Sequence, residues 1–557
     1  MKRIHILIII LTVFNAVNAQ PAWIKKASKS VFTVKTFSAD GNMIGSANGF
    51  FVGDKGEAVS SFTPFKGASS AIVIDAKGKE MKVECILGAS DTYDIVKFRA
   101  VAKQTVPLKL ADSPSHEENA VWLLPYSAKK TPTPIKGQIT KAEVFSGNYT
   151  YYTIMAEAPE NTISCPFLND EGHVIGLLQA PVKNKKNNCF AVSSAFANDL
   201  RISGLSINDA ALKSILIKKE LPNEIDQAIL TMYIAGATLD SAAYENLVED
   251  FIKKFPNSAD GYIYRARLHT NANRFAQADE DMQRAIKYAD KKDDAHYNYA
   301  SLIYNKEIYK KNIPYDKWSL EKAAEETETA YSINPVSTYK QLKAQVRLAQ
   351  KQYEEAYNEY MFIINSGTRT AEMFFMAAKC KEIMNDTTSM LTLLDSAVNT
   401  FSRPYLKTAA PYIIARGQAF AKAGRYRNAV ADFNEYEKLM SSQLNDNFYY
   451  IRAQTELDGN MFQQALDDIT KAIEMSPQND LYYAEKASIE VRVGMLEEAI
   501  STSKECIKLS PESSDGYLFL GYALCLKGKK EEGLKHLERA KELGDEQAQT
   551  IIDRYRQ

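Results

Sequence analysis

A 34-residue repeat near the C-terminus constrains the fold of this chain more than any other feature. Small residues recur at this spacing between Asp446 and Asp545 in three series: Ala453, Ala487 and Gly521; Ala465, Ala499 and Gly533; and Ala472, Cys506 and Ala540. Pro477 and Pro511 keep the same step. The pattern predicts two helices that cross closely, with the proline ending the second helix. Because one such unit cannot bury its own apolar face, it must stack on neighbours in a superhelix.

The best-defined unit resembles the tetratricopeptide repeat family. The family's diagnostic places are held by Tyr449, Ala453, Phe462, Ala465, Ile469, Ala472 and Pro477. Weaker copies extend toward the N-terminus, one of them with an insertion at 306–318. The resemblance implies an all-α superhelix of about nine repeats over residues 224–547, followed by a capping tail at 548–557.

The first residues have the organisation of a secretory signal peptide. Lys2 and Arg3 precede an apolar run from Ile4 to Phe14, and the small residues before Ala19 suit a signal peptidase. The run is shorter than the roughly 20 residues that span a bilayer. Residues 1–19 are therefore predicted to be removed, leaving a chain without a transmembrane segment in the periplasm or outside a bacterial cell.

Residues 20–200 have a different pattern from the repeats. Short stretches rich in Val, Ile, Phe and Thr alternate with Gly, Asp, Lys and Asn, for example at 30–37, 70–75, 82–86 and 94–99. About a dozen short strands with little helical pattern predict an all-β barrel architecture. Residues 201–223 are predicted to be a linker, because a short helical stretch there ends before Pro222.

Three strings in this region resemble the trypsin-like serine proteases of the bacterial HtrA type. They are Gly45–Val52 with Val59–Ser61, Asp91–Val96, and Cys165–Gly176. The resemblance implies a double β-barrel over roughly residues 25–200, with a Ser-His-Asp triad between the barrels. In such a triad the histidine takes the proton of the serine, and the aspartate orients the histidine.

The residues at the triad positions do not fit this chemistry. The alignment places Thr63 at the histidine position, Asp94 at the aspartate position and Ile163 at the serine position. Asn161, Ser164 and Cys165 stand where the family has glycines that shape the oxyanion loop. Ser164 or Cys165 could serve as a fallback nucleophile if the loop shifted in register, but neither has an evident imidazole partner. The domain is therefore predicted to be inactive.

The predicted concave face of the superhelix is the candidate binding surface. The family's concave positions are mixed, with amide, aromatic and cationic side chains at Arg267, Gln345, Gln418, Tyr450, Gln454, Arg492 and Tyr522. Such a surface suits an extended peptide or a partner helix. No unit has the lysine and asparagine of the family's carboxylate clamp.

The net charge and the cysteine spacing argue against some classes of partner and cofactor. The net charge is -1, which gives no general attraction to nucleic acid. The six cysteines include no CxxC pair, so no metal or other cofactor is expected, although Cys165 and Cys189 could form a disulfide in an exported protein. We therefore predict a noncatalytic, exported, protein-binding scaffold. The alternative is an active trypsin-like endopeptidase whose repeats recruit substrate.

Overall fold

The computed structural model describes residues 21–146, 149–181 and 188–556, so the predicted signal peptide lies outside the described residues. The chain forms two compact units with a boundary between Leu268 and His269. Each unit is described by itself. The domain limits predicted from the sequence, at residues 200 and 224, remain a prediction.

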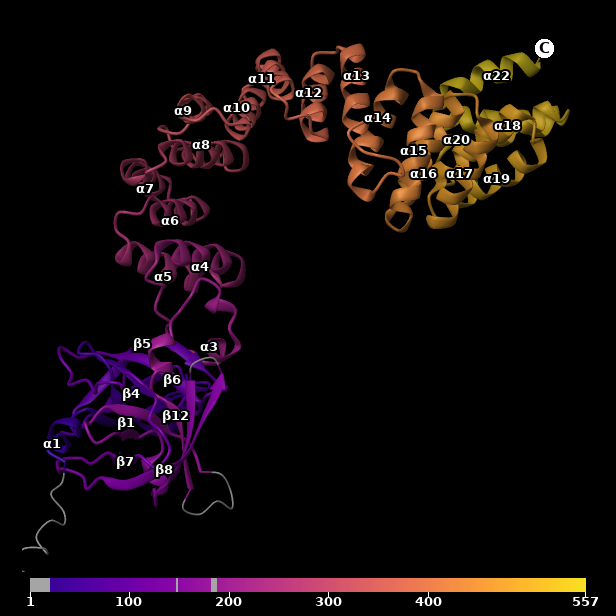
Figure 1. Ribbon diagram of the computed structural model, residues 1–557. Helices are drawn as coiled ribbons and strands as arrows, with labels where there is room; N and C mark the ends of the chain where they lie inside the picture. Colours follow the sequence, from indigo (N-terminus) through magenta and orange to yellow (C-terminus); the bar gives the residue numbers. More distant parts are fainter. Residues whose placement is uncertain (1–20, 147–148, 182–187, 557) are drawn as a thin grey trace, which may run out of the picture. The chain divides into compact units, whose positions relative to one another are not determined.

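Two closed antiparallel β-barrels of six strands each form the N-terminal part of the chain (Figure 1). The first barrel closes in the order β1-β2-β3-β6-β5-β4 and the second in the order β10-β11-β12-β9-β8-β7. This confirms the predicted double β-barrel. The strands are β1 (Val31–Phe37), β2 (Met43–Phe51), β3 (Glu57–Ser60), β4 (Ser70–Ile74), β5 (Glu80–Ser90), β6 (Ile95–Ala100), β7 (Ala120–Leu123), β8 (Ile135–Ser146), β9 (Tyr149–Met155), β10 (Pro166–Leu168), β11 (Val174–Leu178) and β12 (Asn188–Ser193).

Apolar side chains that alternate along the strands fill each barrel. Phe32, Val34 and Phe98 are fully buried in the first barrel, and Ile154 and Phe167 in the second. This alternation is the expected consequence of a strand with one buried face. Two short helices also occur in this region, α1 (Ile24–Ala27) and α2 (Phe196–Asp199), so the N-terminal region contains a little helix that the sequence pattern did not predict.

The segment that the sequence analysis assigned to a linker packs on the first barrel. It contains a short 3₁₀ helix, η3 (Ser206–Asn208), and the helix α3 (Ala210–Ser214), and Leu212, Ile215 and Ile217 are buried in the core of that barrel. The Ile86 amide donates to the Lys218 carbonyl at 2.8 Å, and the Glu220 amide donates to the Ile86 carbonyl at 2.9 Å. Residues 210–220 are thus part of the barrel's packing, because their apolar side chains complete its core.

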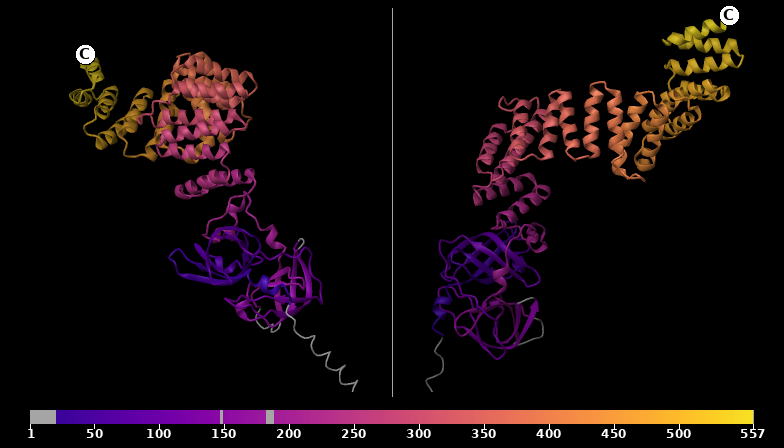
Figure 2. Two further views of the ribbon diagram at one scale, coloured as in Figure 1. Left: turned by 90° about the vertical axis from the view of Figure 1, so that its left-hand side faces the viewer. Right: turned by 45° about the horizontal axis from the view of Figure 1, so that its top comes forward.

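The remainder of the described chain is all-α, as the repeat predicts (Figures 1 and 2). The helices are α4 (Ile225–Thr238), α5 (Ser241–Lys254), α6 (Ala259–Asn271), α7 (Phe275–Tyr288), α8 (Lys292–Tyr309), α9 (Leu320–Ile333), α10 (Ser337–Ala349), α11 (Tyr353–Asn365), α12 (Ala371–Ile383), α13 (Thr387–Val398), α14 (Ala410–Lys422), α15 (Tyr426–Met440), α16 (Asp446–Asp458), α17 (Phe462–Met475), α18 (Asp480–Val493), α19 (Leu496–Leu509), α20 (Ser514–Leu526), α21 (Lys530–Glu542) and α22 (Glu546–Arg556).

The helix starts reproduce the sequence period. The helices α16, α18 and α20 begin at residues 446, 480 and 514, and α17, α19 and α21 begin at 462, 496 and 530, so both series advance by 34. In this stretch the second helix of each pair begins 16 residues after the first. Figure 2 shows the last helices following one another as adjacent pairs. The spacing of small residues therefore predicted the positions of the helices correctly.

The insertion predicted at 306–318 extends the helix α8 and then packs against α7, the second helix of the preceding pair. The helix α8 runs on to Tyr309, and α9 begins only at Leu320. Trp318 donates from Nε1 to Oδ1 of the buried Asp279 at 3.2 Å, and Tyr315 donates to Oδ2 at 3.1 Å. Because Trp318 is buried against Phe275, the insertion is a packed element of the helical unit.

Buried ion pairs join the two helices of two consecutive pairs. Arg416 on α14 donates to both oxygens of Asp432 on α15, at 2.8 and 2.7 Å. Arg452 on α16 makes the same bidentate contact with Asp468 on α17. Both arginines precede their aspartate by 16 residues. The fork of a guanidinium matches the two oxygens of a carboxylate, which fixes the register of one helix against the other.

A buried glutamate next to the second of these pairs gives a pH-dependent prediction. Burial raises the pKa of Glu456 from 4.5 to about 8, the Asp468 carboxylate adds to this effect, and Arg452 and Lys471 oppose it. Between pH 4.5 and pH 8 the folded chain therefore keeps a proton that the unfolded chain releases, so stability falls as the pH rises. We expect Glu456→Gln to reduce this loss by roughly 1 to 3 kcal/mol, since one pKa unit corresponds to about 1.4 kcal/mol.

Urea unfolding of both proteins at pH 5 and pH 8 measures this difference. The exposed Glu474, on α17, provides the control Glu474→Gln, which should leave the pH dependence unchanged. An equal change in pH dependence for the two variants would contradict the assignment to Glu456.

Candidate functional site

A hollow of about 500 Å³ lies between the two β-barrels. The first barrel contributes residues of β1 and β2, the turn after β3 and the turn before β6, and the second contributes the turn before β10. The lining residues are Thr33, Ser46, Ala47, Asn48, Ser61, Thr63, Pro64, Asp94, Tyr126, Glu160, Asn161, Ile163 and Ala180. Thr63, Asp94 and Ile163, which the sequence placed at the three triad positions, all lie in this one hollow.

Thr63 and Asp94 are bonded directly to each other. The Thr63 amide and the Thr63 hydroxyl both donate to Oδ1 of Asp94, each at 2.7 Å. Thr63 begins the short 3₁₀ helix η1 (Thr63–Phe65), and Asp94 has a φ of 47°, in the left-handed region that aspartate tolerates. The carboxylate is thus satisfied by a hydroxyl and an amide. Neither of these groups can take the proton of a nucleophile, because a neutral hydroxyl and an amide N–H already carry their protons and are far weaker bases than an imidazole.

The turn that carries Ile163 is held by the side chain of Asn48. Asn48 Nδ2 donates to the carbonyls of Asn161 and Ile163, at 2.7 and 3.0 Å, and the Asn48 amide donates to the Ile163 carbonyl at 3.3 Å. Asn48 is buried on β2. We call these three hydrogen bonds the Asn48 clamp.

The backbone amides of the same turn are used within the protein. Residues 160–162 form the short 3₁₀ helix η2 (Glu160–Thr162). The Ile163 amide donates to the Glu160 carbonyl at 3.4 Å, and the Cys165 amide donates to the Thr162 carbonyl at 2.9 Å. An oxyanion hole needs amides that point at the reacting oxygen. In this turn the Asn48 clamp and η2 turn the backbone away from that arrangement.

The fallback nucleophiles are buried and lie outside the lining of the hollow. The Ser164 hydroxyl is hydrogen-bonded to the Ser61 hydroxyl, and both side chains are buried. Ser164 has a φ of 67°, the left-handed backbone that a glycine at this place adopts without strain. Burial raises the pKa of the Cys165 thiol to about 12, so a thiolate is disfavoured there.

The two histidines of the barrel region do not line the hollow. His116 is exposed before β7, and His173 lies in the turn between β10 and β11, where its Nδ1 is 3.4 Å from a carboxylate oxygen of Glu171. The polar side chains that bond the turn around Ile163 are instead Asn48, on β2, and Ser61, directly after β3. Sequence reasoning missed both contacts, because nothing in the motif marks these residues as partners of the turn before β10.

We expect that restoring the triad residues alone gives no activity. Thr63→His, Ile163→Ser and the double variant should all stay at background for hydrolysis of a fluorogenic peptide. Removing one oxyanion donor costs roughly 100-fold to 1000-fold in rate, and the Asn48 clamp would still hold the turn in its present shape.

A gain is expected only when Asn161, Ser164 and Cys165 also become glycine and Asn48 becomes alanine. The measurement is steady-state hydrolysis together with fluorophosphonate labelling of each variant. A double variant as active as the fully substituted protein would contradict this account of the turn.

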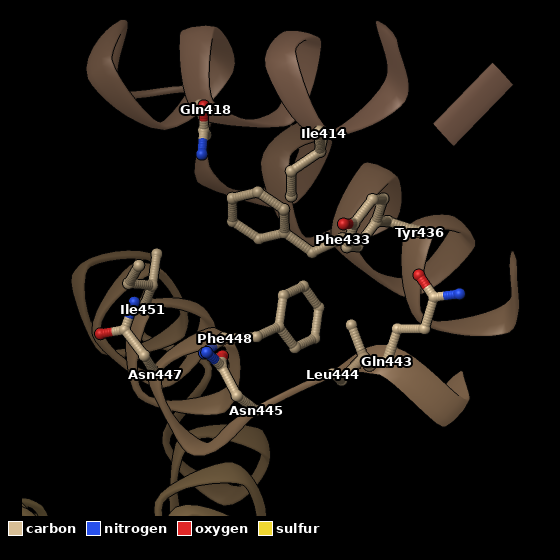
Figure 3. Close-up of a pocket in the computed structure, with 10 residues that line it drawn as sticks. All are labelled: Ile414, Gln418, Phe433, Tyr436, Gln443, Leu444, Asn445, Asn447, Phe448 and Ile451. Atoms are coloured by element: carbon tan, nitrogen blue, oxygen red, sulfur yellow. The ribbon is translucent and has the colours of Figure 1, made fainter. Parts of the chain in front are cut away.

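Among the described helices, hollows at three places are lined by predicted binding residues or their neighbours. The first, of about 270 Å³, lies between α14, α15, the 3₁₀ helix η5 (Ser441–Gln443) and α16, and contains Gln418 (Figure 3). In Figure 3 the rings of Phe433 and Phe448 lie next to each other at this hollow, and they meet edge to face with their centroids 6.2 Å apart. Gln418 also lines a smaller hollow of about 80 Å³ that reaches α12 and α13.

The third hollow lies on α16, α18 and α20, the first helices of three consecutive pairs, and measures about 480 Å³. It contains the predicted binding residues Gln454 and Arg492. Gln454 Nε2 donates to the Tyr450 hydroxyl at 2.7 Å. The lining residues are Gln454, Leu457, Asp458, Leu481, Ala484, Glu485, Ser488, Arg492, Asp515 and Phe519. We call this hollow the α16–α20 groove.

The remaining predicted binding residues lie outside these three hollows. The Tyr522 ring packs edge to face against Tyr555 with centroids 6.4 Å apart. Gln345 lies partly exposed on α10, and Arg267 lies on α6. The structure therefore groups only some of the predicted residues in these hollows.

The structure also bears on disulfide formation, metal binding and membrane crossing. All six cysteines are free and buried, so the pairing of Cys165 with Cys189 that the sequence allowed is not formed. Over the described ranges, no cluster of three or more His, Cys, Asp or Glu side chains could hold a metal ion. None of the helices in the described residues combines the length and apolar character that a membrane crossing requires.

Comparisons with known proteins find similarity only at the level of solved structures. No family model matches the chain, and no curated protein matches it significantly. The chain is similar to the active form of the Rv3671c protease from M. tuberculosis, at 15% identity and a TM-score of 0.29, over 32% of this chain and 82% of that one. The chain is also similar to the inactive form of that protease, at 15% identity and a TM-score of 0.28, over 34% of this chain and 94% of that one.

A serine endoprotease from Yersinia pestis gives 18% identity and a TM-score of 0.27, over 32% of this chain and 62% of that one. These similarities identify no activity for this chain.

Proposed function

We propose that this protein is an exported, noncatalytic scaffold. In this proposal a trypsin-like domain without catalytic machinery is joined to a tetratricopeptide superhelix that binds a protein partner. The observation that carries the proposal is the pair of hydrogen bonds from Thr63 to Asp94 at the base position of the hollow between the barrels. A hydroxyl in place of an imidazole leaves any nucleophile there without a base.

The nucleophile side of the hollow supports the same proposal. Ile163 offers a hydrocarbon where a hydroxyl or thiol would be needed, and Ser164 is buried against Ser61. The Asn48 clamp adds a third loss, that of the oxyanion arrangement. The loss of one catalytic group could be compensated by a neighbouring residue. Three independent losses in one site instead favour a domain with a structural or binding role.

The helical part supports a binding role. Its hollows combine amide side chains, such as Gln418 and Gln454, with aromatic rings, such as Phe433 and Phe519. Amides satisfy the polar groups of a peptide backbone, and aromatic rings supply contact area at a small cost in conformational entropy. A peptide or helix of a partner protein is therefore the class of ligand that these surfaces suit.

Labelling with a fluorophosphonate probe tests the loss of catalysis. The purified mature chain is incubated with the probe and, separately, with unfolded casein, using trypsin as the positive control. We expect no labelling and no casein fragments. Labelling that disappears in Ser164→Ala would show a working nucleophile and would favour an active endopeptidase with a substrate-recruiting superhelix.

Export and partner binding are tested separately from catalysis. N-terminal sequencing of the protein recovered from cells should give Gln20 as the first residue, because cleavage is expected after Ala19. Crosslinking of the tagged full chain in intact cells, followed by mass spectrometry of crosslinked peptides, should place the partner on residues of the helical part. Crosslinks that fall only on the barrels would contradict the binding role of the helices.

A further inference from the structure

The lining of the α16–α20 groove includes exposed apolar side chains. Leu481 on α18 keeps 43% of its surface exposed. Leu457 on α16 and Phe519 on α20 are partly exposed and line the same hollow of about 480 Å³. A hollow of this size that has apolar side chains among polar ones can accept one or two side chains of a ligand.

The walls of the groove carry an excess of negative charge. Asp458, Glu485 and Asp515 line it, against a single guanidinium from Arg492. Within the described residues none of these three carboxylates forms an ion pair, whereas other carboxylates of the helical part do, for example Glu437 with Arg452 at 2.7 Å. The groove thus holds unneutralised negative charge beside exposed apolar surface.

The pKa shifts of two carboxyl groups in the groove agree with this excess of negative charge. Burial raises the pKa values of the Glu485 and Asp515 carboxyl groups, and the Asp515 charge raises that of Glu485 further. A cation placed between these groups would favour their ionised forms and offset the repulsion between them. A metal ion is a poor candidate, since these side chains form no cluster of three metal ligands in the described structure. A nucleic acid would be repelled by the same charge.

We propose that the α16–α20 groove binds a segment of a partner protein that carries a lysine or arginine next to an apolar side chain. This inference rests on the proposed binding role of the helical part and names the chemistry of the partner. The cation lies between the carboxylates of Glu485 and Asp515, and the apolar side chain lies against Leu481 and Phe519.

Fluorescence anisotropy of labelled octapeptides with the full mature chain tests the proposal. The probes are alternating lysine–leucine, glutamate–leucine and serine–leucine peptides. We expect the lysine–leucine peptide to bind most tightly, and the double variant Glu485→Gln, Asp515→Asn to weaken its binding at least about 10-fold, which corresponds to about 1.4 kcal/mol. The variant Leu481→Ser should weaken binding of the lysine–leucine and serine–leucine peptides by a similar factor, because it removes the apolar contact.

A matched control separates the groove from general charge. Glu498 and Glu505 lie exposed on α19 and do not line the groove, so Glu498→Gln, Glu505→Gln changes the net charge equally without touching it. Circular dichroism and thermal melting establish that each variant is folded. Equal weakening by the two double variants, or tighter binding of the glutamate–leucine peptide, would overturn the proposal. Tight binding of the serine–leucine peptide that is unchanged in the charge variants would also overturn the proposal. The helical part would then still bind peptides, but without recognising a cation.

Discussion

The variant Arg452→Met is expected to lower the free energy of unfolding of the helical part by about 3 to 5 kcal/mol, the range for removing one partner of a buried pair. Arg452 is almost fully buried, and its guanidinium donates to both oxygens of Asp468 and to Glu437 and Asn434. Without the arginine, the buried Asp468 carboxylate beside Glu456 loses its bidentate partner and keeps only the exposed Lys471, whose Nζ lies 3.5 Å from Oδ1. The cost comes from that poorly compensated buried charge.

Two further variants identify the cause. Arg427→Met removes an exposed arginine of α15 and should change stability by less than about 0.5 kcal/mol. The double variant Arg452→Met, Asp468→Leu should recover most of the loss, because replacing a whole buried pair by apolar groups is often close to neutral. Denaturant unfolding followed by circular dichroism measures all three. A double variant as unstable as the single one would contradict the explanation by a poorly compensated buried charge.

The second large effect is expected at the closest helix crossing. Ala499→Leu should destabilise the helical part by roughly 1 to 3 kcal/mol through overpacking. Ala499 is fully buried, and it stands at the repeat position that Gly533 holds one unit later. A Cβ atom on Gly533 would lie 2.5 Å from Cys525 Sγ and 2.7 Å from the Gly521 carbonyl oxygen, which shows how little space this position has.

The control for this prediction is Lys530→Ala, on the exposed side of α21. It should leave the midpoint of thermal unfolding almost unchanged. Similar shifts from Ala499→Leu and Lys530→Ala would mean that Ala499 is not at a crossing, and the repeat register would be wrong.

The sequence predicted the helical part well because its signal is periodic. Small residues 34 apart allow only helices that begin 34 apart, and α16, α18 and α20 do so. The barrels were predicted from strings of strand residues and turn glycines rather than from a period. The packing of residues 210–220 on the first barrel could not be predicted, because Leu212 and Ile217 look like the apolar residues of any short helix until the open side of the barrel is known.

The candidate site could be predicted only in part. The resemblance placed Thr63, Asp94 and Ile163 at the triad positions, and the three residues do line one hollow. They do so because the strands of each barrel fix those positions. The Asn48 clamp could not be predicted, because a side-chain amide that holds a turn 113 residues away leaves no local pattern. The acidic walls of the α16–α20 groove were missed for a related reason. Glu485 and Asp515 lie on different helices, and only the stacking of the pairs brings them to one hollow.

Digestion of a proteome-derived peptide library tests the central claim, the absence of catalysis, most directly. The mature chain and its Ser164→Ala variant are each incubated with the library, and new peptide termini are counted by mass spectrometry against a buffer control. Our account predicts the same background for both proteins, because Ser164 is buried against Ser61 and Thr63 offers no base. Cleavage by the wild-type chain that is absent from Ser164→Ala would contradict it.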